Sequence, residues 1–155
     1  MFGQTYRVTL NEDGKTFESD TDHTVTLALV AIFLANKYYQ GAENRLNIGH
    51  VNNLCLIHDL VEAYAGDTDS FMADFNEGST AKQDKKIREH EAFLRLESEF
   101  KNEFPWLIEH IHEYENLTSR EARFVKTVDK ITPKITHILN GGQYIKNNDV
   151  DIDKW

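Results

Sequence analysis

The segment HDLVEAYAGD, residues 58–67, concentrates one histidine and three acidic residues. On a helix, side chains four positions apart share a face, so His58 and Glu62 would point the same way, with Asp59 rotated by about 100° from His58. Apolar neighbours indicate that much of this helix is packed. Burying a histidine beside a carboxylate costs several kcal/mol unless the pair is hydrogen-bonded or binds a metal. Taken alone, the segment fits a functional site, an internal polar pair or a solvent-exposed helix face.

Two further polar residues widen this pattern. His23 lies at the start of a strongly apolar stretch, and Asp129 lies four residues before Pro133. The proline ring clashes with the carbonyl four residues back, so we expect the backbone to bend at Asp129. His23, the His58–Asp59 pair and Asp129 would then come from three helices, which a helical bundle can bring together in its core.

Imidazole and carboxylate ligands suit a divalent metal ion such as Mn²⁺, Co²⁺, Fe²⁺ or Mg²⁺, and the sequence leaves the choice open. The lack of cysteine ligands argues against a structural zinc site. The single Cys55 lies in an apolar run and is interpreted as a small buried hydrophobe. The remaining histidines are interpreted as structural: His50, His90, His110, His112 and His137.

Three separated segments resemble the H…HD…D signature of the HD-domain metal-dependent phosphohydrolases. They are ESDTDH at 18–23, HDLVEAYAGD at 58–67 and EARFVKTVDKITP at 121–133. The fuller pattern is most similar to the small 5′-deoxynucleotidase branch of that family. The resemblance spans about residues 5–140, and the order of the segments makes it specific for the family but not for a substrate.

The resemblance implies roles for individual residues. Four would bind the metal: His23, His58, Asp59 and Asp129. Glu62 and Asp67 would be the catalytic acid and base, one activating water and the other protonating the leaving 5′-oxygen, and the two roles are interchangeable at this level. Arg7 is the candidate for binding the substrate phosphate, and Lys130 is a weaker one. A bound divalent ion would lower the pKa of its water from 15.7 toward about 7, which suits hydrolysis of a phosphate ester.

The resemblance predicts a 5′-nucleotidase that releases phosphate from (deoxy)nucleoside 5′-monophosphates. Two alternatives remain: a (deoxy)nucleoside triphosphate triphosphohydrolase, which shares the metal signature, and a non-catalytic HD-like module that binds a nucleotide or a protein. The presence of all six acidic and histidine positions argues against the module. Tyr6 and Val8 flank Arg7 where deoxynucleotidases usually carry a tryptophan, so base and sugar preference stay open.

Composition limits the partners. The 155 residues are 40% hydrophobic and 28% charged, which is ordinary for one globular domain. The net charge of -9 argues against a nucleic-acid polymer, although a bound cation can still attract a small phosphorylated substrate. The apolar run at 25–35 is too short to span a bilayer, and no stretch resembles a signal peptide, so we expect a cytoplasmic protein with no membrane contact. The aromatic-rich segment 105–115 leaves a homodimer open.

The elements that must position these side chains are helices. Hydrophobic periodicity and end signals predict a short strand at 5–10 and five or six helices, among them 22–41, 49–65, 80–104, 105–116 and 118–140. The fold prediction is an all-α helical bundle of the HD-domain type. We expect a single domain over residues 1–155, with a core over about 5–140 and a polar C-terminal tail at 141–155.

Overall fold

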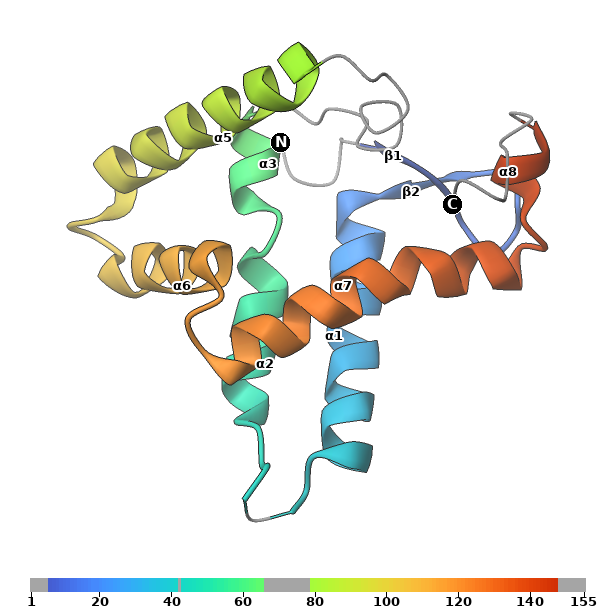
Figure 1. The fold of residues 1–155 in the computed structure, drawn as a ribbon, viewed down its shortest axis with the longest axis horizontal. Coiled ribbons are helices and arrows are strands. Elements are labelled where there is room, and N and C mark those ends of the chain that lie inside the picture. Colours follow the sequence, from blue (N-terminus) through green and yellow to red (C-terminus); the bar gives the residue numbers. More distant parts are fainter. Residues whose placement is uncertain (1–5, 42, 66–78, 148–155) are drawn as a thin grey trace.

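Helices build most of this chain, as the sequence predicts. The computed structural model describes residues 6–41, 43–65 and 79–147. Its elements are β1 (Tyr6–Leu10), β2 (Phe17–Ser19), α1 (Asp20–Tyr38), α2 (Ile48–Ile57), α3 (Leu60–Ala65), α5 (Ser79–Phe100), α6 (Pro105–Asn116), α7 (Arg120–Leu139) and α8 (Gln143–Asn147). The all-α class is confirmed, with one small two-stranded sheet at the side of the helices (Figure 1).

The two strands form an antiparallel hairpin that the sequence predicts only in its first strand. Gly14 in the turn has φ of 64°, in the left-handed region that glycine adopts readily. The side-chain amide of Asn140, just after α7, donates to the backbone oxygen of Leu10 at 3.0 Å. The hairpin is therefore fastened to the end of α7, and it carries Arg7 and Glu18 toward the start of α1.

Helix α1 begins directly after β2. The Ser19 hydroxyl accepts from the backbone N–H of Asp22, and the Asp22 carboxylate accepts from the backbone N–H of Ser19, which is a capping box. This reciprocal cap fixes where the helix starts and so fixes His23 in its first turn. The helix ends at Tyr38, shortly before the stop predicted at Gly41.

The single helix predicted over 49–65 is wrong, because the structure divides it into α2 and α3. The side chain of Asn47 caps α2, and the interruption falls at His58 and Asp59. In an unbroken helix the carbonyl of Cys55 would accept from the backbone N–H of Asp59. Here that carbonyl accepts from the His58 ring at 2.7 Å. A side chain that competes for a helix carbonyl favours such a break.

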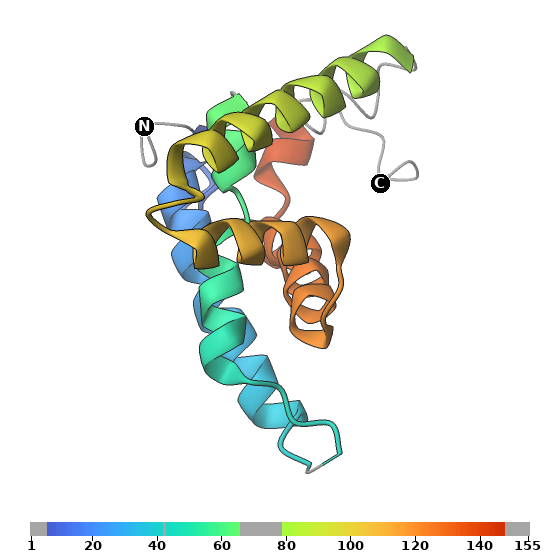
Figure 2. The same ribbon diagram turned by 90° about the vertical axis from the view of Figure 1, so that its left-hand side faces the viewer.

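Helices α5 and α6 form an arm beside the other helices (Figure 2). The helix predicted over 80–104 ends earlier, at Phe100. Phe104 then precedes α6, which opens with Pro105 in its first turn, where the missing N–H has no helical partner to lose. Leu117 closes α6 in the left-handed conformation, with φ of 52°. The limits of α6 agree with the prediction.

Helix α7 crosses in front of α1 and α2 in Figure 1. The Ser119 hydroxyl caps it by accepting from the backbone N–H of Ala122 at 2.9 Å. The helix runs through Pro133 as far as Leu139. Pro133 has no N–H to donate to the carbonyl of Asp129, so the ladder loses one bond without ending the helix.

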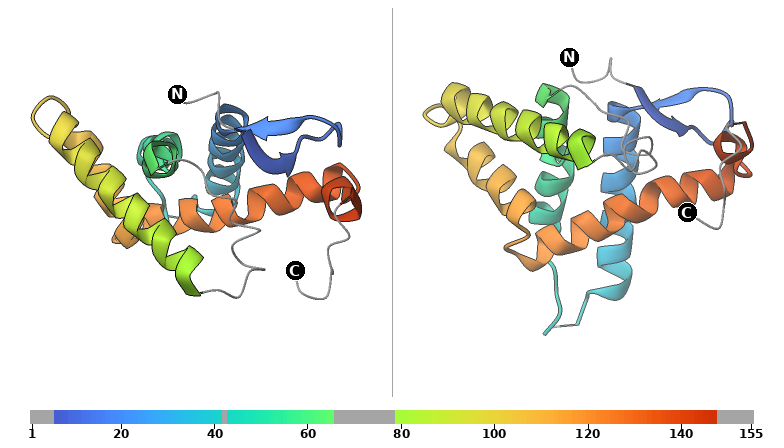
Figure 3. Two further views of the ribbon diagram at one scale, coloured as in Figure 1. Left: turned by 90° about the horizontal axis from the view of Figure 1, so that it is seen from above. Right: turned by 45° about the horizontal axis from the view of Figure 1, so that its top comes forward.

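The core lies where α1, α2, α6 and α7 meet (Figure 3). Small residues on α1 let it pack closely on α2. The fully buried apolar side chains include Leu27, Ala31, Val51, Leu54, Ile111 and Val125. None of the helices in the described ranges is both long and apolar enough to cross a membrane.

Candidate metal centre

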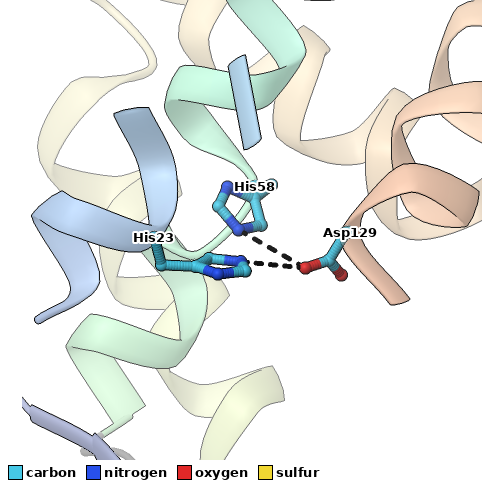
Figure 4. Close-up of side chains that lie close together, drawn as sticks. All are labelled: His23, His58 and Asp129. Atoms are coloured by element: carbon cyan, nitrogen blue, oxygen red, sulfur yellow. Dashed lines mark hydrogen bonds and ion pairs between the residues drawn. The ribbon is translucent and has the colours of Figure 1, made fainter. Parts of the chain in front are cut away.

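Three of the predicted ligands converge in the middle of the helical core (Figure 4). His23 comes from α1, His58 from the break after α2, and Asp129 from α7. One ligand atom from each lies within 4.8 Å of the other two. The Oδ1 atom of Asp129 is 3.0 Å from His23 Nε2 and 3.9 Å from His58 Nε2. Both imidazoles therefore face one carboxylate oxygen.

The break between α2 and α3 determines which nitrogen His58 presents. Its Nδ1 lies 2.7 Å from the backbone oxygen of Cys55, which can only accept, so Nδ1 carries the proton. In the neutral ring Nε2 then has a free lone pair directed at the cluster. This Nε2 is buried and makes no hydrogen bond within the described residues, and the neighbouring Asp59 Oδ2, 3.1 Å away, is itself an acceptor. A buried, unpartnered lone pair fits a metal ligand.

His23 has a carboxylate on each side of its ring. Its Nε2 faces Asp129, and its Nδ1 lies 3.6 Å from Glu18 Oε2. Histidines that bind metals commonly direct their second ring nitrogen at a carboxylate, which fixes the orientation of the ring. Glu18 is buried on β2, and no role was predicted for it. The available signal was its place as the first residue of the ESDTDH segment.

Asp59 lies beside the three residues but is not part of their tight set. Its Oδ2 is 3.1 Å from His58 Nε2 and 2.7 Å from Arg7 Nη1. The Arg7 guanidinium also lies 3.8 Å from Glu18 Oε2 and 3.9 Å from Asp20 Oδ1. Arg7 is thus surrounded by three carboxylates and holds Asp59 against the cluster. Metal binding by Asp59 and phosphate binding by Arg7 stay predictions.

The cluster is arranged for positive charge at its centre. Burial alone would lower the pKa of His23, but its contacts with Asp129 and Glu18 outweigh burial and raise that pKa to about 9. Burial would raise the pKa of Asp59, yet its contact with His58 and the nearby positive charges hold it well below its usual range. The site therefore favours a cation between ionised carboxylates. A divalent ion replacing the proton on His23 would satisfy the same groups.

Glu62 follows His58 by one helical turn, on α3. Burial and the charge of Asp59 raise the pKa of the Glu62 carboxyl above its usual value, and Lys85 opposes them in part. Its Oε2 lies 3.6 Å from Lys85 Nζ, and its side chain is one-third exposed. A carboxyl with a raised pKa beside an acidic cluster suits a group that takes up and releases a proton.

Two more residues were predicted for the site, Asp67 and Lys130. Asp67 lies outside the described residues. Lys130 follows Asp129 on α7, and its side chain is exposed. Phosphate binding by Lys130 stays a prediction.

Two residues that the sequence did not single out support Asp129. The buried Tyr114 of α6 donates its hydroxyl to Asp129 Oδ2 at 3.5 Å. Burial and the charge of Asp129 raise the pKa of that hydroxyl, so it stays protonated and a donor. Lys126 Nζ lies 3.7 Å from the same oxygen and 4.9 Å from the centre of the Tyr114 ring. The sequence signals for Lys126 were its place in the EARFVKTVDKITP segment of the family resemblance and its spacing of three residues from Asp129, on one helix face.

The sequence of the whole described region matches a known family. A sequence model of the HD domain family covers residues 4–155. The chain belongs to the HD-domain family. The predicted resemblance to the HD-domain phosphohydrolases is thereby confirmed at the level of the family.

This HD domain is also similar to curated proteins. It is 32% identical over 117 residues to "5'-deoxynucleotidase HDDC2" of Homo sapiens, and equally to the protein of that name from Mus musculus. The match covers 73% of this chain and 50% of the human protein. The chain therefore spans about half the length of the curated relatives it matches.

Solved structures share the fold of this HD domain. One is described as a predicted metal-dependent phosphohydrolase from Magnetospirillum magnetotacticum MS-1, with a TM-score of 0.73 and 28% identity, over 96% of this chain and 71% of that one. Another is the PH0347 protein from Pyrococcus horikoshii OT3, with a TM-score of 0.61 and 25% identity, over 92% of this chain and 72% of that one. The helical arrangement around the cluster is thus a known one.

Proposed function

We propose that this HD domain is a metal-dependent phosphohydrolase that acts on nucleoside 5′-monophosphates and releases inorganic phosphate. The observation that carries the proposal is the convergence of His23, His58 and Asp129 from three parts of the fold, in which the buried Nε2 of His58 makes no hydrogen bond to any described residue. The similarity to relatives named as a 5′-deoxynucleotidase and a metal-dependent phosphohydrolase supports this class of reaction.

The residues that would hold the ion are His23, His58 and Asp129, with Asp59 as the fourth ligand. Their nitrogen and oxygen atoms suit Mn²⁺, Co²⁺, Fe²⁺ or Mg²⁺. When bound, a divalent ion supplies Lewis acidity and a water of lowered pKa. Glu18 keeps the ring of His23 in place through Nδ1, and Tyr114 does the same for Asp129 through Oδ2.

We assign the proton transfers to Glu62 and Asp67. With its raised pKa, the Glu62 carboxylate accepts a proton from the attacking water more readily than an ordinary glutamate would. Asp67 then protonates the leaving 5′-oxygen. Arg7 keeps Asp59 ionised and oriented, and we assign to it a contact with the phosphate through an N–H group that Asp59 does not use. In this scheme the ligands stay ionised while Glu62 changes its protonation.

Product identification tests this proposal. Metal-stripped protein would be incubated with a panel of nucleoside mono- and triphosphates, with and without Mn²⁺ or Co²⁺, and the products separated by chromatography. We expect metal-dependent release of orthophosphate from monophosphates. The matched control is Asp129→Asn, which keeps the size of the side chain and removes its charge, and should release none.

The same experiment decides between the alternatives. Triphosphate released from a deoxynucleotide would replace the proposal with a triphosphohydrolase. Absence of turnover with every substrate and metal, in a protein that still binds a nucleotide, would indicate a binding module.

A further inference from the structure

The charges around the predicted metal centre are distributed unevenly. On the hairpin side, the single positive charge of Arg7 meets three carboxylates, those of Asp59, Glu18 and Asp20, at 2.7, 3.8 and 3.9 Å. Burial lowers the pKa of this guanidinium, but the carboxylate charges outweigh burial and raise it. The charge of Arg7 is therefore already balanced within the protein. A phosphate entering this acidic centre needs a further cation.

Lys126 contacts the oxygen of Asp129 that the two imidazoles do not face. Its Nζ is 3.7 Å from Asp129 Oδ2, whereas His23 and His58 face Oδ1. The ammonium group also lies over the ring of Tyr114, 4.9 Å from the ring centre. A cation over an aromatic face is attracted to it and is held there. The position of Lys126 is thus fixed by two contacts on two helices.

The cluster reaches solvent on this side. The side chains of His23 and His58 are 0% and 1% exposed, while that of Asp129 is 16% exposed and that of Lys126 is 37% exposed. Lys126 also acts on Glu62, since its charge is among those that lower the pKa of the Glu62 carboxyl. The open edge of the centre is therefore bordered by a metal ligand, a proton acceptor and an ammonium group.

Two other lysines of this region are placed differently. Lys85 lies 3.6 Å from Glu62 and 3.5 Å from Glu89, so its charge is shared between two carboxylates. Lys130 lies one turn further along α7 and is exposed, whereas Lys126 is partly buried. Lys126 is the lysine that contacts a predicted metal ligand directly.

We propose that Lys126 binds the phosphate group of the substrate at the open edge of the metal centre. This inference rests on the proposed function and adds a residue to it. The ammonium group offers three N–H donors and a full positive charge. Its partner Asp129 becomes a metal ligand, so the ammonium charge is then available to the phosphate. Tyr114 keeps the lysine from turning away.

The test uses three variants of the metal-loaded protein: Lys126→Gln, Lys126→Arg and the control Lys101→Gln, which removes an exposed lysine that pairs with Glu97. Inorganic phosphate serves as the probe, and its affinity is measured by titration calorimetry, together with the metal content, KM and kcat for a nucleoside monophosphate. We expect K126Q to keep its metal and to bind phosphate at least about 10-fold more weakly, with KM raised by a similar factor. K126R should recover part of the loss, and K101Q should match wild type.

The outcomes separate this inference from the proposed function. Wild-type protein that turns over no nucleotide, while K126Q has lost phosphate affinity, would refute the nucleotidase and keep Lys126 as an anion site. Unchanged phosphate affinity in K126Q, or a wild-type protein that binds no phosphate, overturns the inference. Loss of metal from K126Q with no loss of phosphate affinity would instead assign Lys126 to holding Asp129, and it overturns the inference as well.

Discussion

Two sites in this molecule bring histidine within hydrogen-bond distance of a carboxylate. At the predicted metal centre His23 Nε2 lies 3.0 Å from Asp129 Oδ1, and at the other end of α2 His50 Nε2 lies 2.7 Å from Glu113 Oε1. Distance alone would rank the second contact above the first. The ring of His110 also lies edge-on to that of His50, with ring centres 4.9 Å apart.

The surroundings of the two contacts differ. The side chains of His50 and Glu113 are 23% and 19% exposed, and they come from the start of α2 and the end of α6. Burial would raise the pKa of Glu113, but bonds from Ser119 and His50 lower it, so its charge is satisfied within the protein. At the metal centre both histidines are buried, and the Nε2 atoms of both lie within 4 Å of the same oxygen, Asp129 Oδ1.

The predicted metal centre differs from the His50–Glu113 contact in the number of possible ligand atoms that converge. Within the described residues, only the group of His23, His58 and Asp129 brings three possible ligand atoms within 4.8 Å of one another. Buried polar atoms without partners are costly and rare, so their presence together indicates a ligand. If the cluster binds a metal and the His50–Glu113 contact does not, substitutions at the cluster should have much larger effects on activity than substitutions at that contact.

Removing the shared carboxylate should abolish the reaction. We expect Asp129→Asn to lower kcat by more than about 1,000-fold, because the ion and its water are the main source of rate acceleration in such hydrolases. The matched control is Glu113→Gln, the same chemical change at the other histidine–carboxylate contact, and it should keep at least half of the wild-type kcat. Equal losses in the two variants, measured by orthophosphate release, would refute the distinction drawn here.

Removing the proton acceptor should lower the rate without removing the metal. Glu62→Gln is expected to reduce kcat by about 10²–10⁴-fold, the usual contribution of a general base. The raised pKa of Glu62 predicts that the wild-type rate increases with pH as this carboxyl loses its proton, and E62Q should lack that increase. A pH–rate profile together with the metal content checks both points. An unchanged profile would remove Glu62 from the mechanism.

Without metal, the raised pKa of His23 should make the stability of the protein depend on pH. The pKa of His23 is about 9 in the folded chain and about 6.5 when unfolded, so its contribution to stability is complete below pH 6.5 and is lost as the pH rises through 9. Between pH 6.5 and 8 the free energy of unfolding should fall by up to about 2 kcal/mol. Chelator-treated protein would be unfolded in urea at each pH.

Between pH 6.5 and 8 the change in the free energy of unfolding that comes from His23 can be measured without a contribution from Cys55. Burial raises the pKa of the Cys55 thiol to about 12, so it reduces stability only above its unfolded value of about 8.5. The control is His23→Asn, in which the decline between pH 6.5 and 8 should be absent. A wild-type stability that does not change over this range would contradict the assigned charge.

The smallest effect is expected at the other contact. Replacing His50 by glutamine removes a partly exposed ion pair, which contributes about 1 kcal/mol or less to the free energy of unfolding. Metal content and kcat should not change. A loss of metal from H50Q would mean that the two histidine–carboxylate contacts are not as different as their burial indicates.

Sequence patterns predicted the helices better than the contacts between them. Hydrophobic periodicity and Pro105 predicted where α6 begins and ends. The HD-domain resemblance identified residues on or next to α1, α2 and α7 that the fold brings together. The break at His58 was missed because it depends on a side chain competing for the carbonyl of Cys55, which no propensity encodes. Glu18 and Tyr114 were missed because their roles follow from distances between different elements of the fold. Lys126 was missed although it lies three residues before Asp129 on the same helix, because only the structure shows its second contact, with the Tyr114 ring.

The most direct test of the central claim is a titration of Mn²⁺ into metal-stripped protein, followed by calorimetry. Wild type and Glu113→Gln should each bind one ion per chain, and His58→Gln should bind it at least about 100-fold more weakly. That result would place the ion among the three converging side chains. A wild-type chain that binds no ion, or an H58Q variant that binds it as tightly as wild type, would contradict the account.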